Sequence, residues 1–112
     1  MPAGAEVHSL ADHVAAILGL AQTPAIVATT NRSERWQDQG FTVCRTVSDY
    51  RFDNGVQIRR TVEQDDFPDA LACAECWIEY TVLADAGQPL QPVRKSFDNA
   101  CREAFWLAYH RA

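Results

Sequence analysis

The sequence predicts an α+β fold in which an antiparallel β-meander of about four strands carries an N-terminal helix and a long C-terminal helix on one face. Two segments indicate the strands. Residues 53–55 (Asp-Asn-Gly) and 85–87 (Asp-Ala-Gly) each separate two β-rich runs, as three-residue hairpin loops do. Apolar residues that recur at helical spacing near both ends of the chain indicate the helices. The 112 residues are expected to form a single globular domain, 1–112.

The first helix is expected over about residues 10–21. Ser9 and Asp12 have the spacing of a capping box, and the apolar residues that follow share one helical face. The next segment, 23–40, gives the weakest signal in the chain. Its residues 25–30 are rich in β-branched side chains and predict a short strand, and a polar loop or helical turn is expected around Ser33 to Gln39.

The loop at 53–55 also predicts how its two strands, 41–52 and 56–64, are paired. A three-residue loop closed by a glycine places Phe52 opposite Val56, and every other pair follows from that one. On one face this register creates two pairs of opposite charge: Arg45 with Glu63, and Asp49 with Arg59. The other face is mostly apolar. A two-residue loop would mix polar and apolar residues on both faces, so we prefer the three-residue loop.

The second half of the chain predicts two more strands and a helix. Residues 74–84 alternate as a strand does, and the loop 85–87 is expected to turn the chain so that Val82 faces Leu90 and Ala84 faces Gln88. Prolines at 89 and 92 mark that fourth strand as a short edge. The final helix is expected from about 93 to 110. Its core-facing stripe is Phe97, Ala100, Cys101, Ala104 and Ala108, with Phe105 and Leu107 on the shoulders.

Composition and charge exclude several classes of function. The chain is 47% hydrophobic and 22% charged, and its longest apolar run is far short of the ~20 residues of a membrane span. No signal-peptide pattern opens it, so a cytoplasmic and, from its small size, bacterial protein is expected. Residues 61–93 contain seven acidic side chains and no basic one, which disfavours nucleic-acid binding. The acidic segment 63–85 is instead a candidate docking surface for a basic protein.

The cysteines give a weak signal for chemistry. The four are expected to be reduced and to behave as small apolar residues. Only Cys73 and Cys76 have a metal-like or redox-like spacing, but a single CxxC that enters a strand favours burial over a zinc or redox site. No cofactor, metal site or catalytic residue is predicted. An enzyme, or a zinc or redox protein using this pair, is kept as the second alternative.

Arg60 is the one charge that the hairpin register places on the apolar face, opposite Ser48. One interpretation is structural: Arg60 reaches solvent, or pairs with a helix carboxylate such as Asp12 or Glu103. The other is a pocket between sheet and helices in which Arg60 holds a small anion, with the hydroxyl groups of Tyr50 and Tyr80 nearby. The second interpretation is our first alternative function.

Two tryptophans break the binary pattern and carry the leading hypothesis. Trp106 falls on the charged side of the last helix beside Tyr109, and Trp77 points to the charged face of the sheet. Either each is covered within the fold or both belong to an interface core framed by charge. The predicted interface comprises Trp77, Trp106, Tyr109, Arg45, Arg59, Glu79, Val43 and Val47. The leading hypothesis is a protein–protein binding module: a homodimer, or an adaptor, inhibitor or immunity-type protein.

Overall fold

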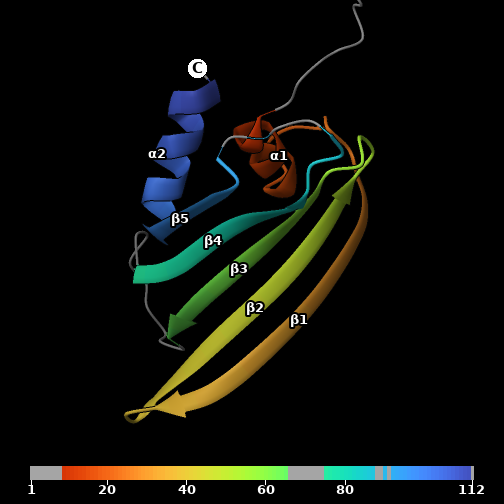
Figure 1. Ribbon diagram of the computed structural model, residues 1–112. Coiled ribbons are helices and arrows are strands. Elements are labelled where there is room, and N and C mark those ends of the chain that lie inside the picture. Colours follow the sequence, from red (N-terminus) through yellow and green to blue (C-terminus); the bar gives the residue numbers. More distant parts are fainter. Residues whose placement is uncertain (1–8, 66–74, 88–89, 91, 112) are drawn as a thin grey trace, which may run out of the picture.

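The computed structural model describes residues 9–65, 75–87, 90 and 92–111. It confirms the α+β class: an antiparallel sheet carries a short helix from the start of the chain and a longer one from its end (Figure 1). Within these residues the sheet has five strands, in the order β1-β2-β3-β4-β5, and not four. The elements are α1 (Leu10–Ile17), β1 (Ile26–Asp38), β2 (Phe41–Phe52), β3 (Gln57–Asp65), β4 (Glu75–Ala84), β5 (Arg94–Asn99) and α2 (Ala100–Arg111).

Helix α1 begins at the predicted capping box and ends earlier than predicted. The Asp12 backbone N–H donates to Ser9 Oγ (3.2 Å), and the Ser9 N–H donates to Asp12 Oδ2 (2.9 Å). The helix ends at Ile17 instead of 21 because Gly19 takes a left-handed conformation (φ +76°), which terminates helices. Leu10 and Val14 are completely buried on its inner side.

Strand β1 corrects the prediction for residues 33–39. These form no loop or helical turn but continue the strand to Asp38, and the strand pairs with β2 along its length. The two strands are joined by Gln39 and Gly40, both at positive φ (51° and 85°), as a two-residue hairpin turn of type I′ requires. The sequence predicts only a short strand in this segment, and the full-length β1 brings the sheet to five strands.

The hairpin of β2 and β3 is confirmed in loop and register. The Phe52 N–H donates to the Val56 carbonyl (2.9 Å), and Gly55 has φ +86°. The partners are those predicted, among them Arg45 with Glu63, Asp49 with Arg59 and Ser48 with Arg60. Both pairs of opposite charge therefore form across the strands.

The prediction for residues 88–110 is wrong in its boundaries. The described partner of β4 on this side is β5, with Ile78 opposite Phe97 and Thr81 opposite Arg94. Of the predicted fourth strand, 88–92, only Leu90 and Pro92 are among the described residues. The Val82 N–H accordingly donates to the Val93 carbonyl (2.8 Å). Helix α2 starts at Ala100, because residues 94–99 are held in the sheet.

Both helices lie on one face of the sheet, as predicted, and the core lies between them and the sheet (Figure 1). Buried side chains of the sheet and its central hairpin include Phe52, Val56, Ile58, Ile78 and Tyr80. The far ends of β1 and β2 extend beyond the helices (Figure 1). There the strands are joined by polar pairs, such as Gln37 Nε2 to Thr42 Oγ1 (2.8 Å).

Candidate functional site

Helix α2 turns the side that the sequence marks as its inner side towards solvent. Between Ala100 and His110, the buried residues of the helix are Glu103 and Leu107, with 6% and 4% of their surface exposed. The helical residues of the predicted core stripe lie on the other side: Ala100, Cys101, Ala104 and Ala108 are all exposed. Phe105 is 74% exposed and Tyr109 73%. The prediction of the inner face is therefore wrong, and α2 presents an apolar surface that the described part of the fold leaves open.

A polar contact with the sheet fixes this orientation of α2. The hydroxyl of Tyr80, on β4, donates to Glu103 Oε2 at 2.6 Å, and Arg60 Nε donates to the same hydroxyl at 2.9 Å. Arg60 Nη2 lies 3.8 Å from Glu103 Oε2. Burial raises the pKa of the Tyr80 phenol far above its usual range, and the bond to Glu103 adds to the shift, so the hydroxyl stays protonated.

Two of the four residues predicted for an anion pocket, Arg60 and Tyr80, thus form a hydrogen-bonded cluster with Glu103. Arg60 has the helix carboxylate that the structural interpretation expected, in the form of Glu103. Ser48 is buried opposite Arg60, and Tyr50 is half-buried on the same face. Since Glu103 offsets the charge of Arg60, these contacts explain the position of Arg60 by a structural role: it links the sheet to α2. Anion binding here stays a prediction.

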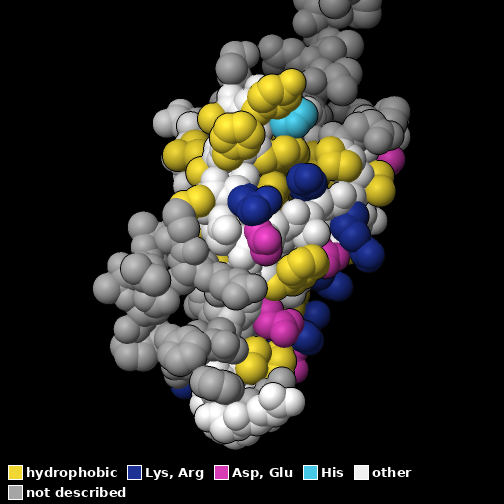
Figure 2. All heavy atoms as spheres, turned by 90° about the vertical axis from the view of Figure 1, so that its left-hand side faces the viewer, with side chains coloured by type: hydrophobic (Ala, Val, Ile, Leu, Met, Phe, Trp, Pro, Cys, Tyr) yellow, Lys and Arg dark blue, Asp and Glu magenta, His cyan; other side chains and the backbone are white. Residues whose placement is uncertain are grey.

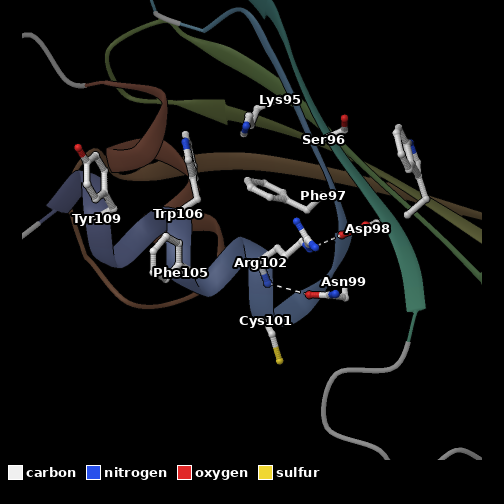
Figure 3. A pocket seen from close by; sticks show the side chains of 11 residues that line it. Lys95, Ser96, Phe97, Asp98, Asn99, Cys101, Arg102, Phe105, Trp106 and Tyr109 are labelled. Carbon is white, nitrogen blue, oxygen red and sulfur yellow. Dashed lines mark hydrogen bonds and ion pairs between the residues drawn. The ribbon is translucent and has the colours of Figure 1, made fainter.

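A groove of about 860 Å³ runs between β5 and α2, which we call the β5/α2 groove. In Figure 3, Lys95 and Phe97 project from β5, and Arg102, Phe105, Trp106 and Tyr109 from α2. Trp77 lines it from β4. Three residues of the predicted interface, Trp77, Trp106 and Tyr109, are therefore brought together at one surface, although they come from different elements.

The tryptophans contribute to this groove in different ways. Trp106 is half-buried: its ring packs against the Phe97 ring (centroids 5.4 Å apart) and against His110 (5.2 Å). It is thus covered on one side by the core and open to the groove on the other. Trp77 remains 46% exposed, and its indole N–H reaches Glu79 Oε2 at 3.4 Å.

Charged and polar groups frame the aromatic centre of the groove. Arg102 Nε binds Asp98 Oδ1 at 2.9 Å, and Asn99 Oδ1 accepts the Arg102 backbone N–H at 2.8 Å, which caps α2. The Lys95 ammonium lies over the Phe97 ring, 5.4 Å from its centroid. Figure 2 looks onto this side and shows hydrophobic side chains gathered above charged ones. An aromatic centre with a charged rim is the composition of protein interfaces.

Sequence reasoning missed part of the groove. It places Phe105 on the shoulder of the core stripe, and it places Lys95, Asp98 and Arg102 in a helix that does not begin before Ala100. The spacing of Asp98 and Arg102, four residues apart, is the available signal, but it reads as an ordinary surface pair.

The other predicted interface residues lie on the outer face of the sheet. Val43 and Val47 are buried there (8% and 6% exposed), between the side chains of neighbouring strands. Their charged neighbours are paired: Arg45 with Glu63 (3.1 Å) and over the Trp36 ring, Arg59 with Asp49 (2.8 Å), and Glu79 with Arg94 (3.1 Å). Each of the three charged residues predicted for the interface therefore has a partner of opposite charge, and the role of this face in an interface stays a prediction.

The remaining candidates give little chemistry. Cys73 lies outside the described residues, and Cys76 is a half-buried free thiol whose pKa is raised by burial. Cys101 is disulfide-bonded. The expectation of four reduced cysteines is therefore wrong at Cys101. Within the described ranges, no three His, Cys, Asp or Glu side chains could hold a metal ion together.

Residues 66–74 of the acidic segment 63–85 lie outside the described residues. Glu63 and Glu79, which are described, bind Arg45 and Arg94. Neither α1 nor α2 has the length and apolar character of a membrane-spanning helix. Comparisons with protein-family models, curated proteins and solved structures return no match for this chain.

Proposed function

We propose that the chain is a protein–protein binding module that associates with a second copy of itself through the β5/α2 groove and the exposed side of α2. The observation that supports this proposal most is the orientation of α2, which is opposite to the predicted one: Phe105 and Tyr109 face solvent while the carboxylate of Glu103 is buried. These two aromatic rings are exposed to water, so the fold lacks the stabilisation that their burial would provide, roughly 25 cal/mol per Å² of apolar surface. A partner that covers this surface recovers it.

A second copy fits this surface because the surface is complementary to itself. A two-fold dimer brings the same patch of both subunits together, so each patch must carry both members of every contact. The β5/α2 groove does so: it combines a hollow with the protruding rings of Phe105 and Tyr109, and its rim carries both signs of charge in Asp98 and Arg102.

The proposal predicts a dimer in solution. Light-scattering mass of the parent chain, measured from about 1 to about 100 µM, should pass from monomer to dimer or remain dimeric. Phe105→Glu places a charge in the centre of the surface and should shift the mass to that of the monomer. A parent chain that is monomeric over the whole range would overturn the proposal.

Val27→Glu is the matched control. Val27 is also an exposed apolar residue (56%), but it lies on β1, at the opposite edge of the sheet. It should leave the dimer intact. Equal loss of the dimer in both variants would show that the effect is not specific to α2, and circular dichroism of both verifies that they are folded.

A further inference from the structure

We propose that the second copy docks by strand pairing: β5 of one copy lies antiparallel to β5 of the other, with Ser96 opposite Ser96, so that one sheet continues through the dimer. This inference rests on the proposed function and specifies how the two copies meet. It is carried by the outer edge of β5, which no described strand covers, and by the order of charges along it.

The outer edge of β5 offers backbone groups for pairing. In the sheet, β5 follows β4 and is the last of the described strands. The Val82 N–H donates to the Val93 carbonyl, so the backbone of Val93 points towards β4. Because the direction alternates along a strand, the N–H and C=O groups of Arg94, Ser96 and Asp98 point away from β4. A row of this kind at a sheet edge is a template for another strand.

The side chains along the edge select one register. In an antiparallel pair of two β5 strands, residues with outward backbone groups oppose each other, so the two-fold axis passes between the two copies of one residue. An axis at Lys95 places the two Lys95 side chains opposite each other, and their like charges repel. An axis at Phe97 leaves Arg94 without an acidic partner. An axis at Ser96 sets Arg94 opposite Asp98 at both ends of the pairing, and opposite charges across strands stabilise a sheet.

The same axis brings the aromatic surfaces together. A two-fold axis that relates neighbouring antiparallel strands stands perpendicular to the sheet, so both copies of α2 lie on the same face. Helix α2 follows β5 directly, and the groove beside it opens along this edge, from Lys95 to Asn99. Strand pairing therefore covers Phe105 and Tyr109 and the edge of β5 in one step.

Two single variants test the register. In a homodimer of Arg94→Asp, the introduced carboxylate opposes Asp98 at both ends of the pairing, and in a homodimer of Asp98→Arg the introduced guanidinium opposes Arg94 at both ends. Each homodimer should have a Kd raised about tenfold, because two like-charge pairs replace two attractive ones.

A mixture of the two variants restores the attraction. In the heterodimer, one chain carries aspartate at positions 94 and 98 and the other carries arginine at both. Each cross-strand pair therefore joins an aspartate to an arginine. The heterodimer should form with a Kd within about threefold of the parent value. Contacts within each chain, from Arg94 to Glu79 and from Asp98 to Arg102, are the same in homodimer and heterodimer and cancel in the comparison.

Ser96→Cys tests the axis directly. Residues that oppose each other as a hydrogen-bonded pair have Cα atoms about 5.5 Å apart, which a disulfide spans. Mild oxidation should link this variant into covalent dimers on a non-reducing gel. Ser33→Cys, on the exposed edge strand β1, should not be linked.

The outcomes separate the two proposals. If the parent is a dimer that Phe105→Glu dissociates, but the charge variants show no preference for each other and Ser96→Cys gives no covalent dimer, strand pairing is overturned and the binding surface on α2 stands. If the parent is monomeric throughout, the proposed function itself fails. Preference of the two charge variants for each other together with the Ser96→Cys link supports the register.

Discussion

The hydroxyl of Tyr80 donates a 2.6 Å hydrogen bond to Glu103 and thereby ties the middle of the sheet to helix α2. Tyr80 is completely buried, and Arg60 donates to the same oxygen atom. Because this cluster occupies the inner side of α2, it sets which residues of the helix meet the core and which meet solvent. The exposed aromatic surface is thus a consequence of a buried polar contact.

Removing the Tyr80 hydroxyl should destabilise the fold. Tyr80→Phe leaves Arg60 Nε and Glu103 without their common partner, which should lower the free energy of unfolding by about 1–3 kcal/mol. Urea unfolding followed by fluorescence measures this. Tyr50→Phe is the control: the Tyr50 hydroxyl makes no hydrogen bond to any residue that the structure describes, and the change should be within about 0.5 kcal/mol. Equal stability of Tyr80→Phe and the parent would contradict this role.

The orientation of α2 predicts opposite effects for two of its apolar residues. Leu107→Ala empties a buried site and should cost about 2–5 kcal/mol at any protein concentration. Phe105→Ala removes an exposed ring, so its cost should depend on protein concentration, as expected for a residue that stabilises only the dimer. Urea unfolding at two concentrations distinguishes them. The reverse pattern would mean that the helix faces the core with its apolar stripe after all.

The hairpin glycines offer a comparison at matched backbone conformation. Gly55 and Gly40 have nearly the same positive φ (+86° and +85°), so alanine at either costs about 1–2 kcal/mol. A Cβ at Gly55 would in addition lie 3.0 Å from Ala86 Cβ, whereas none of the described atoms lies within 4 Å of a Cβ at Gly40. Gly55→Ala should therefore lower the melting temperature more than Gly40→Ala does. A larger loss in Gly40→Ala would argue against the contact between the two loops.

The Asp49–Arg59 pair should give a small acid-dependent stability. The hydrogen bond from Arg59 holds the pKa of Asp49 below its ordinary value of 3.8. With a lowered folded-state pKa, the pair stabilises the fold above about pH 4, and this contribution is lost as the pH falls through the folded-state pKa. Since both side chains are partly exposed, Asp49→Asn should cost about 0.2–1 kcal/mol at neutral pH.

At a pH below the folded-state pKa of Asp49, where the carboxyl is protonated in the folded and the unfolded state, Asp49→Asn and the parent should have the same stability. Unfolding curves at both pH values test this. A difference that is unchanged from neutral to acid pH would show that the ion pair is not its source.

The hairpin of β2 and β3 could be predicted residue by residue because its loop is short and its two faces differ in polarity. Strand β1 could not. Its residues 31–35 are exposed on both sides, so no alternation of polar and apolar side chains marks them as a strand. Their pairing is determined by β2, through a Gln39–Gly40 turn that lacks the usual asparagine or aspartate.

The start of α2 is misplaced in the prediction for a related reason. Phe97 continues the helical stripe of Cys101 and Ala104, so periodicity extends the helix backwards through residues that the sheet pairs with β4. The groove itself depends on that boundary, and it depends on the burial of Glu103, a residue that sequence patterns assign to the surface.

The tryptophans of the groove could be recognised in advance. Trp77 and Trp106 each conflict with charged surroundings in the sequence, and that conflict does not depend on where the last helix begins. Both line the groove in the structure. A large ring among charged residues is thus a signal that survives an error in the element boundaries.

No residue separates β5 from α2: Asn99 ends the strand and caps the helix through Arg102, and Ala100 begins the helical turns. The angle between the aromatic side of the helix and the outer edge of the strand is therefore set by the count of residues alone. Inserting one residue at this junction would rotate every side chain of α2 by about 100° relative to β5. The length of this junction therefore fixes the rotation of α2 relative to β5. Related sequences that keep this surface should differ here by substitutions and not by insertions or deletions.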